Sequence, residues 1–128
     1  MSEDKGRKTV LVVEDDLLSM TLTVDLLELN GFDTLKCADG KSAIDTLQSN
    51  APDLILLDIG LPDIDGYEVH KRIREDSRFS RIKIIALSAS VMKEDVEKIM
   101  AAGFDDFLPK PIDIKSFIKR IRERLSPA

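Results

Sequence analysis

The chain has 128 residues, 43% hydrophobic and 34% charged, and this length suits one compact domain that folds without disulfides or a structural metal. The formal net charge of -5 at pH 7 argues against a nucleic-acid partner, because contact with a phosphate backbone needs excess lysine and arginine. Cys37 is the only cysteine, the N-terminal residues lack the apolar core of a secretory signal, and no apolar run could span a bilayer, so we expect a cytoplasmic protein that makes no membrane contact.

The N-terminal third of the chain predicts strand, helix and strand. Residues 9–13 form an apolar run rich in β-branched side chains, which favours a strand. Helical spacing follows over residues 17–29, where one face carries Leu18, Leu22, Leu26 and Leu29. Gly31 ends this helix, since glycine is favoured just past a helix C-terminus. Residues 32–37 are then expected to form a second strand, more polar than the first.

The middle of the chain repeats the same alternation. A helix is expected to begin after Asp39-Gly40 and to end before Pro52. Its inward-facing residues are Ala43, Ile44 and Leu47. Residues 54–57 form an apolar strand without alternation. A loop over residues 62–66 leads into a third helix, whose inward residues are Val69 and Ile73.

The last third adds two further strand and helix pairs. Residues 82–87 are expected to form a strand, and residues 94–102 a helix that Gly103 closes. Residues 106–108 form a short strand. Asp113 caps a final helix, in which apolar residues recur at Ile114, Phe117, Ile118, Ile121 and Leu125.

This fivefold alternation predicts an α/β fold, a doubly wound (βα)5 unit with a five-stranded parallel sheet and helices on both faces. The flavodoxin-like strand order 2-1-3-4-5 is the natural arrangement for five strands. Two features agree with it. The strand at residues 32–37, an edge in that order, is polar, and the opposite edge strand ends at Pro109, where proline is tolerated.

In such a sheet, ligands bind at the carboxyl ends of the strands, and chemically active residues follow four of the five strands. Glu14 and Asp15 follow the first strand, Asp58 the third, Ser88 the fourth and Lys110 the fifth. Oxygen ligands favour a hard cation, so we expect Mg²⁺ with Asp15 and Asp58 as direct ligands and Glu14 acting through water. With Mg²⁺ and Lys110 neutralising the pocket, an Asp58 oxygen can attack a phosphoryl group, whose other oxygens Lys110 and Ser88 serve.

These residues lie in four segments that together resemble the receiver domain of bacterial response regulators. The segments are residues 10–16 (VLVVEDD), 56–62 (LLDIGLP), 86–89 (ALSA) and 108–111 (LPKP). The resemblance extends from about Lys8 to Leu125. We therefore expect one receiver domain over residues 1–128, with a core at about 8–125 and no output domain.

The resemblance implies a role for each matching residue. Asp58 is expected to be the phosphoacceptor, and Glu14 and Asp15 the acidic pair that recruits Mg²⁺. The backbone carbonyl of Gly60 is expected to be a further metal ligand. Ser88 corresponds to the switch hydroxyl, Lys110 to the lysine that contacts the phosphoryl group, and the Lys110-Pro111 bond is expected to be cis. Phe107 occupies the aromatic switch position, where many relatives have tyrosine, and its ring cannot form a hydroxyl hydrogen bond.

The predicted function is that of a signalling switch. The resemblance implies that a histidine kinase or phosphotransfer protein phosphorylates Asp58, and that the domain catalyses only its own phosphorylation and dephosphorylation. Output is then the binding of a protein partner, through a face formed by residues 94–102, residues 106–108 and the last helix, or the onward relay of phosphate. We expect a monomer or weak dimer.

Two other functions are open on the same fold. A Mg²⁺-dependent phosphatase that works through an aspartyl phosphate usually has a second acid two residues after the nucleophile, where this chain has Gly60. A flavin-binding electron carrier needs a phosphate-binding loop after the first strand, where Glu14, Asp15 and Asp16 would repel the flavin phosphate.

The remaining notable residues favour structural roles. Asp16 is expected to be a solvated acid in the first helical turn. His70, the only histidine, is expected on the solvent side of its helix, and Met20, Met92 and Met100 in the core or filling gaps. The final helix is basic, which indicates either a solvated face or a docking surface.

Overall fold

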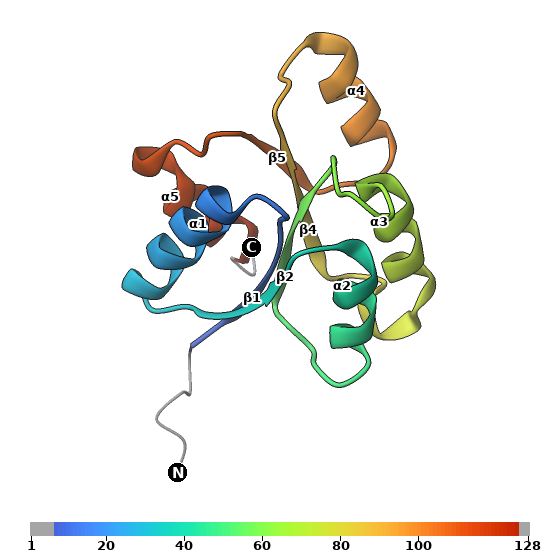
Figure 1. The fold of residues 1–128 in the computed structure, drawn as a ribbon, viewed down its shortest axis with the longest axis horizontal. Coiled ribbons are helices and arrows are strands. Elements are labelled where there is room, and N and C mark those ends of the chain that lie inside the picture. The colour runs from blue at the N-terminus through green and yellow to red at the C-terminus, as the bar shows by residue number, and fades with distance from the viewer. Residues whose placement is uncertain (1–6, 126–128) are drawn as a thin grey trace.

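A five-stranded parallel sheet lies at the centre of the computed structural model, which describes residues 7–125 (Figure 1). Its strands are β1 (Thr9–Val13), β2 (Asp33–Cys37), β3 (Leu54–Asp58), β4 (Lys83–Ser88) and β5 (Asp106–Pro109). The spatial order is β2-β1-β3-β4-β5, which confirms the flavodoxin-like order. In the central strand β3 all five residues are buried, whereas the edge strand β2 is mostly half-buried or exposed. The difference explains why only the central strands are uniformly apolar.

Helices cover both faces of the sheet. They are α1 (Leu17–Leu29), α2 (Gly40–Leu47), α3 (Gly66–Glu75), α4 (Lys93–Ala101) and α5 (Ile114–Leu125), with a short 3-10 turn η1 (Ser77–Phe79) before β4. Helices α1 and α5 lie on one face, and α2, α3 and α4 on the other (Figure 1). Two apolar clusters result, one on each side of the sheet. None of the helices within residues 7–125 has the length and apolar character needed to cross a membrane.

Aspartates begin three of the helices just after the strands. The side chains of Asp16, Asp39 and Asp65 each accept a hydrogen bond from the backbone N–H three residues further on, at 2.8 to 2.9 Å. These are N-cap interactions, each worth about 1 kcal/mol. Asp16 is therefore the N-cap residue of α1. The sequence had suggested a position within the first helical turn, which begins one residue later. At the other ends, Gly31 and Gly103 have φ angles of 90° and 102°, which favour glycine.

The leucine face of α1 is exposed at its two ends, whereas Leu22 and Leu26 between them are half-buried. Leu18 and Leu29 are 80% and 82% exposed, whereas Val24 and Leu27 pack into the core. The helix is thus apolar on two sides, because both the inward positions and the leucine positions carry aliphatic residues. Ile114, at the start of α5, is also exposed. Large apolar side chains on a helix surface are normally covered, so these exposed residues are open to a partner.

Three side chains lie where the sequence did not place them. The expectation that His70 faces solvent is wrong: its side chain is buried, and its ring centroid lies 4.4 Å from that of Phe104. Phe104 follows α4 and covers this side of α3. The expectation of a core position is also wrong for Met92 and Met100, which are exposed, whereas Met20 does pack against the core.

Candidate functional site

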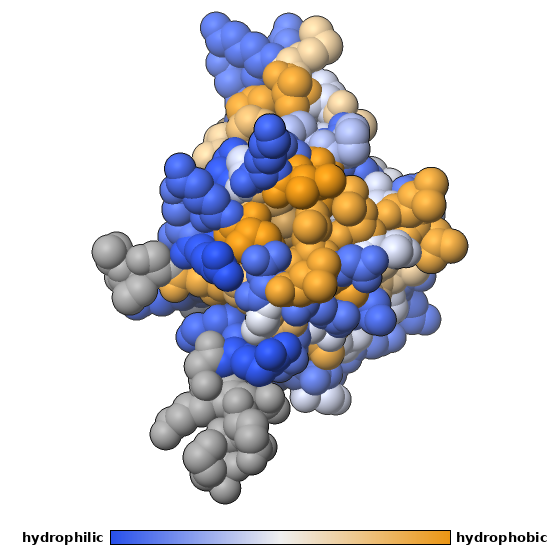
Figure 2. Space-filling view, turned by 90° about the vertical axis from the view of Figure 1, so that its left-hand side faces the viewer, coloured by the Kyte–Doolittle hydropathy of each residue, from blue (hydrophilic) through white to orange (hydrophobic). Residues whose placement is uncertain are grey.

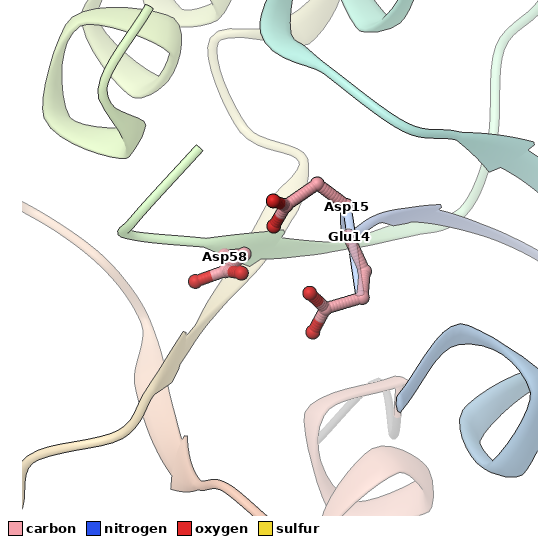
Figure 3. A group of neighbouring side chains, drawn as sticks. All are labelled: Glu14, Asp15 and Asp58. Carbon is pink, nitrogen blue, oxygen red and sulfur yellow. The ribbon is translucent and has the colours of Figure 1, made fainter. Parts of the chain in front are cut away.

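Three acidic side chains converge at the carboxyl edge of the sheet. Glu14 and Asp15 directly follow β1, and Asp58 is the last residue of β3. Because β1 and β3 are hydrogen-bonded neighbours, these ends lie side by side. One carboxylate oxygen from each of the three residues lies within 4.8 Å of the others. Figure 3 shows the three carboxylates turned toward a common space.

Lys110 brings a positive charge into this cluster from the far edge of the sheet. It follows β5, and its Nζ donates hydrogen bonds to Asp58 Oδ2 at 2.9 Å and to Glu14 Oε2 at 3.1 Å. Glu14 Oε1 also lies 2.9 Å from the ammonium. The lysine therefore bridges two buried carboxylates that belong to different strands. The peptide bond between Lys110 and Pro111 is cis, as expected.

The backbone orients the two buried carboxylates. The N–H of Gly60 donates to Asp58 Oδ1 at 2.9 Å, and the N–H of Asp16 donates to Glu14 Oε2 at 3.0 Å. Asp58 is therefore held through both oxygens, one by Gly60 and the other by Lys110. Such bonds fix the direction in which each carboxylate points.

Burial and the neighbouring charges act against each other on the pKa values of Glu14 and Lys110. Burial raises the pKa of Glu14, and hydrogen bonds from Lys110 and the Asp16 backbone lower it only in part. Burial by itself would lower the pKa of Lys110, but the carboxylates of Glu14 and Asp58 outweigh it and raise that pKa. One lysine thus faces three carboxylates, which leaves the site with excess negative charge.

The residues fit a hard divalent cation. All the converging side-chain ligands are carboxylate oxygens, which is the donor set that Mg²⁺ prefers. Glu14 Oε1 is fully buried and, although ion-paired, has no hydrogen-bond partner among the described residues. A cation or its bound water would satisfy this oxygen and reduce the repulsion between the acids.

A pocket of about 450 Å³ opens above these residues. Its lining includes Asp15, Asp58, Gly60, Ser88 and Lys110, so the structure brings together six of the seven predicted site residues once the adjoining Glu14 is included. The seventh, Phe107, lies in β5 outside the pocket lining and packs, half-buried, against an apolar cluster. Ser88 is buried, and its hydroxyl donates to the carbonyl of Ser90 at 2.9 Å, away from the acids.

Other residues of the lining were not predicted. They include Tyr67 of α3, Ser90 of the loop between β4 and α4, and Asp95 and Lys98 of α4, with the Lys98 ammonium 4.6 Å from the centre of the Tyr67 ring. Asp95 and Lys98 are three residues apart and so share a helix face, which the sequence could have indicated. Nothing in the sequence says that this face is turned toward Asp58, because that depends on the path of the loop before α4.

Comparisons with known proteins agree with this geometry. The family model described as "Response regulator receiver domain" matches residues 10–122. The polar-differentiation response regulator DivK of Brucella anthropi is 40% identical over 121 residues, which cover 94% of this chain and 98% of that protein. The receiver domain of response regulator 1452 from Francisella has a TM-score of 0.85 at 31% identity, over 93% of this chain and 97% of that one.

A further solved structure concerns the metal. The receiver domain of a sensor histidine kinase from Pseudomonas aeruginosa PAO1 has a TM-score of 0.86 at 30% identity, covering 93% of this chain and 98% of that one. That structure has a magnesium ion coordinated in its active site cleft. The present chain belongs to the response-regulator receiver family and is a phosphoacceptor signalling switch. Membership favours this function over the phosphatase and electron-carrier alternatives.

Proposed function

We propose that residues 8–125 act as one receiver unit in which Asp58 takes up the phosphoryl group. The observation that carries this proposal is the position of Asp58: its carboxylate lies at the floor of an open pocket, held by Lys110 and the Gly60 N–H. An Asp58 oxygen forms a bond to phosphorus while the bond from phosphorus to the donor's imidazole nitrogen or acyl oxygen breaks. The donor leaves with the bonding electrons, and no oxidation occurs.

The surrounding residues stabilise charge during this transfer. Lys110 neutralises the acceptor and then the phosphoryl oxygens, and the Ser88 hydroxyl can donate to one of them once it leaves Ser90. Glu14, Asp15 and Asp58, with the carbonyl of Gly60, are the proposed Mg²⁺ ligands. Bound Mg²⁺ would supply neutralisation of the negative charge that gathers on the transferring group. The domain thereby catalyses its own phosphorylation and dephosphorylation.

The proposed phosphodonor is a protein with a phosphorylated histidine, and its proposed docking surface is the exposed face of α1 and α5. Figure 2 shows apolar side chains gathered on this face among hydrophilic ones. A groove of about 750 Å³ lies here. Its lining combines the apolar residues Leu26, Ile114 and Ile118 with three basic residues and one acid, namely Lys115, Lys119, Arg122 and Glu123, and with Asn30.

Two arguments favour a donor in this place. The exposed leucines at 17 and 18 follow the acidic residues 14–16 in the chain, so a donor whose histidine reaches Asp58 would approach beside them. The groove also suits a helix with an apolar face and an acidic flank, which would pair with the basic residues of α5. Helix-in-groove contact of this kind buries the leucine face that the fold leaves open.

The proposed output is a change in the surface formed by α4, β5 and α5. Val91 and Met92, just before α4, and Met100 within it are 57%, 65% and 46% exposed. Phe107 lies in β5 between this surface and the core, and we propose that its packing changes together with Ser88. A downstream protein would bind the apolar residues of α4 in one of the two states.

The test is the intact mass of the protein after incubation with Mg²⁺ and acetyl phosphate. Wild type should gain one phosphoryl group, and Asp58→Asn, which keeps the shape of the side chain, should gain none. Wild type without Mg²⁺ should react much more slowly. Equal gains in wild type and Asp58→Asn would overturn the assignment of Asp58.

A further inference from the structure

The hydroxyl of Ser88 is engaged by its own loop. It donates to the carbonyl of Ser90 at 2.9 Å and accepts from the N–H of Ser90 at 3.2 Å. A serine hydroxyl has a single hydrogen to donate. While Ser88 donates to Ser90, it cannot donate to a phosphoryl oxygen on Asp58. The position of the Ser90 backbone therefore controls whether Ser88 is free for the pocket.

Asp95 fixes Ser90 in turn. The Ser90 hydroxyl donates to Asp95 Oδ2 at 2.5 Å and accepts from the N–H of Met92 at 3.3 Å. Met92 is the N-cap residue of α4, and its own side chain forms no capping bond. The Ser90–Asp95 bond thus ties the β4–α4 loop to the first turn of α4. It is short and charge-assisted, which makes it stronger than a bond between neutral groups.

We propose that Asp95 is a positioning residue for phosphoryl uptake, which acts through Ser90 to keep the Ser88 hydroxyl bonded to its loop and away from Asp58. This role rests on the proposed function of Asp58. The loop and the phosphoryl group compete for one hydroxyl, so a weaker loop bond shifts the population toward the uptake-competent arrangement. Loss of one charge-assisted hydrogen bond corresponds to about a tenfold change in that population.

Asp95 has a second property that the test must separate from this one. Its carboxylate lines the pocket, so removing its charge also reduces repulsion of an incoming anion. Ser90→Ala breaks the same hydrogen bond without changing any charge. Glu94→Gln removes an equal charge from the same helical turn, at an exposed position outside the pocket. Ser90→Ala therefore removes the hydrogen bond at constant charge, together with the contact from the Met92 N–H, and Glu94→Gln measures the effect of removing a charge from this helical turn outside the pocket.

The experiment measures the rate at which acetyl phosphate and Mg²⁺ phosphorylate the full chain, by intact mass against time. Ser90→Ala and Asp95→Asn should each react about tenfold faster than wild type. Combining S90A with D95N should add less than twofold to the faster single variant, since both act on the Ser90–Asp95 hydrogen bond, which S90A removes and D95N deprives of its charge assistance. Glu94→Gln should stay within about twofold of wild type. In a Ser88→Ala background, S90A should give no acceleration, because the hydroxyl it releases is absent.

Three results would overturn the positioning role. The first is a phosphorylation rate of Ser90→Ala equal to that of wild type. If Asp95→Asn alone were faster, the gain would come from the lost charge and not from the lost hydrogen bond. The second is an acceleration by S90A that persists with S88A. The third is an equal gain from Glu94→Gln. A wild type that takes up no phosphate contradicts the proposed function itself and is thereby distinguished from all three.

Discussion

Lys110 holds together two buried carboxylates, and its replacement by methionine should destabilise the protein in a way that depends on pH and Mg²⁺. The substitution keeps an unbranched apolar stem of similar length and removes the ammonium, which lies 2.9 Å from both Glu14 Oε1 and Asp58 Oδ2. Glu14 and Asp58 are 1% and 4% exposed, so neither can turn fully into water. The variant would leave two like charges facing each other.

The size of the effect follows from burial. Removing one partner of a fully buried ion pair costs about 3–5 kcal/mol. The Lys110 side chain is 19% exposed and the pocket mouth is open, so solvent screening reduces the expected loss to about 2–3 kcal/mol near pH 7.5 without Mg²⁺. This loss should be measured by urea unfolding followed by circular dichroism, since the chain has no tryptophan.

The dependence on pH has a definite sign. Burial already raises the pKa of Glu14, and Lys110→Met removes a hydrogen bond that lowers it. An acid whose folded-state pKa is raised binds protons more tightly when folded, so the variant gains stability relative to wild type as pH falls toward that pKa. The deficit should shrink to below about 1 kcal/mol near pH 5, or with saturating Mg²⁺.

The control is Lys119→Met, which removes an exposed charge from α5 and should change stability by less than about 0.5 kcal/mol. A Lys110→Met variant as stable as wild type near neutral pH would refute the view that the lysine neutralises a strained acidic cluster. A deficit that does not change with either pH or Mg²⁺ would show that it comes from lost packing.

Three further predictions concern other parts of the fold. Asp106→Asn removes the charge of a carboxylate that accepts hydrogen bonds from Arg120 and Arg124, and should lower the free energy of unfolding by about 1–2 kcal/mol near neutral pH. Hydrogen bonds from the arginines outweigh burial and lower the pKa of Asp106, so the difference in unfolding free energy between the variant and wild type, measured in urea, should narrow below pH 3.8. Burial lowers the pKa of His70, so its imidazole should titrate below pH 6.5 when followed by NMR. The contribution of His70 to folding stability should therefore fall as the pH drops below 6.5, and His70→Leu should lack this part of the pH dependence. Leu18→Glu should slow phosphotransfer from a phosphohistidine protein at least about tenfold, while the rate of phosphorylation by acetyl phosphate should change less than twofold. Met100→Glu on α4 should change neither of these two rates.

The sequence predicted the strands, their order and most of the site, because these features depend on local signals. Continuous apolar runs mark strands that are covered on both faces, and β3 shows this pattern in full. In a parallel sheet the carboxyl ends of all the strands lie along one edge, so the residues at the ends of β1, β3 and β5, which include Asp15, Asp58 and Lys110, are brought to the same side without knowledge of any loop.

Features that depend on tertiary packing could not be read in this way. His70 is buried because residues far along the chain, Phe104 among them, pack against its ring. The leucine face of α1 remains open because Val24 and Leu27 already fill the space against the sheet. An apolar stripe in a helix predicts a contact, but it does not say whether the contact lies within the chain.

The central claim, that Asp58 carries the phosphoryl group, is tested most directly by locating the group. After phosphorylation with acetyl phosphate and Mg²⁺, borohydride reduces an aspartyl phosphate to homoserine, and mass spectrometry of peptides locates that change. Homoserine at position 58 alone is the predicted result. Homoserine at position 15, or a phosphate ester on Ser88 that borohydride does not reduce, would contradict the assignment.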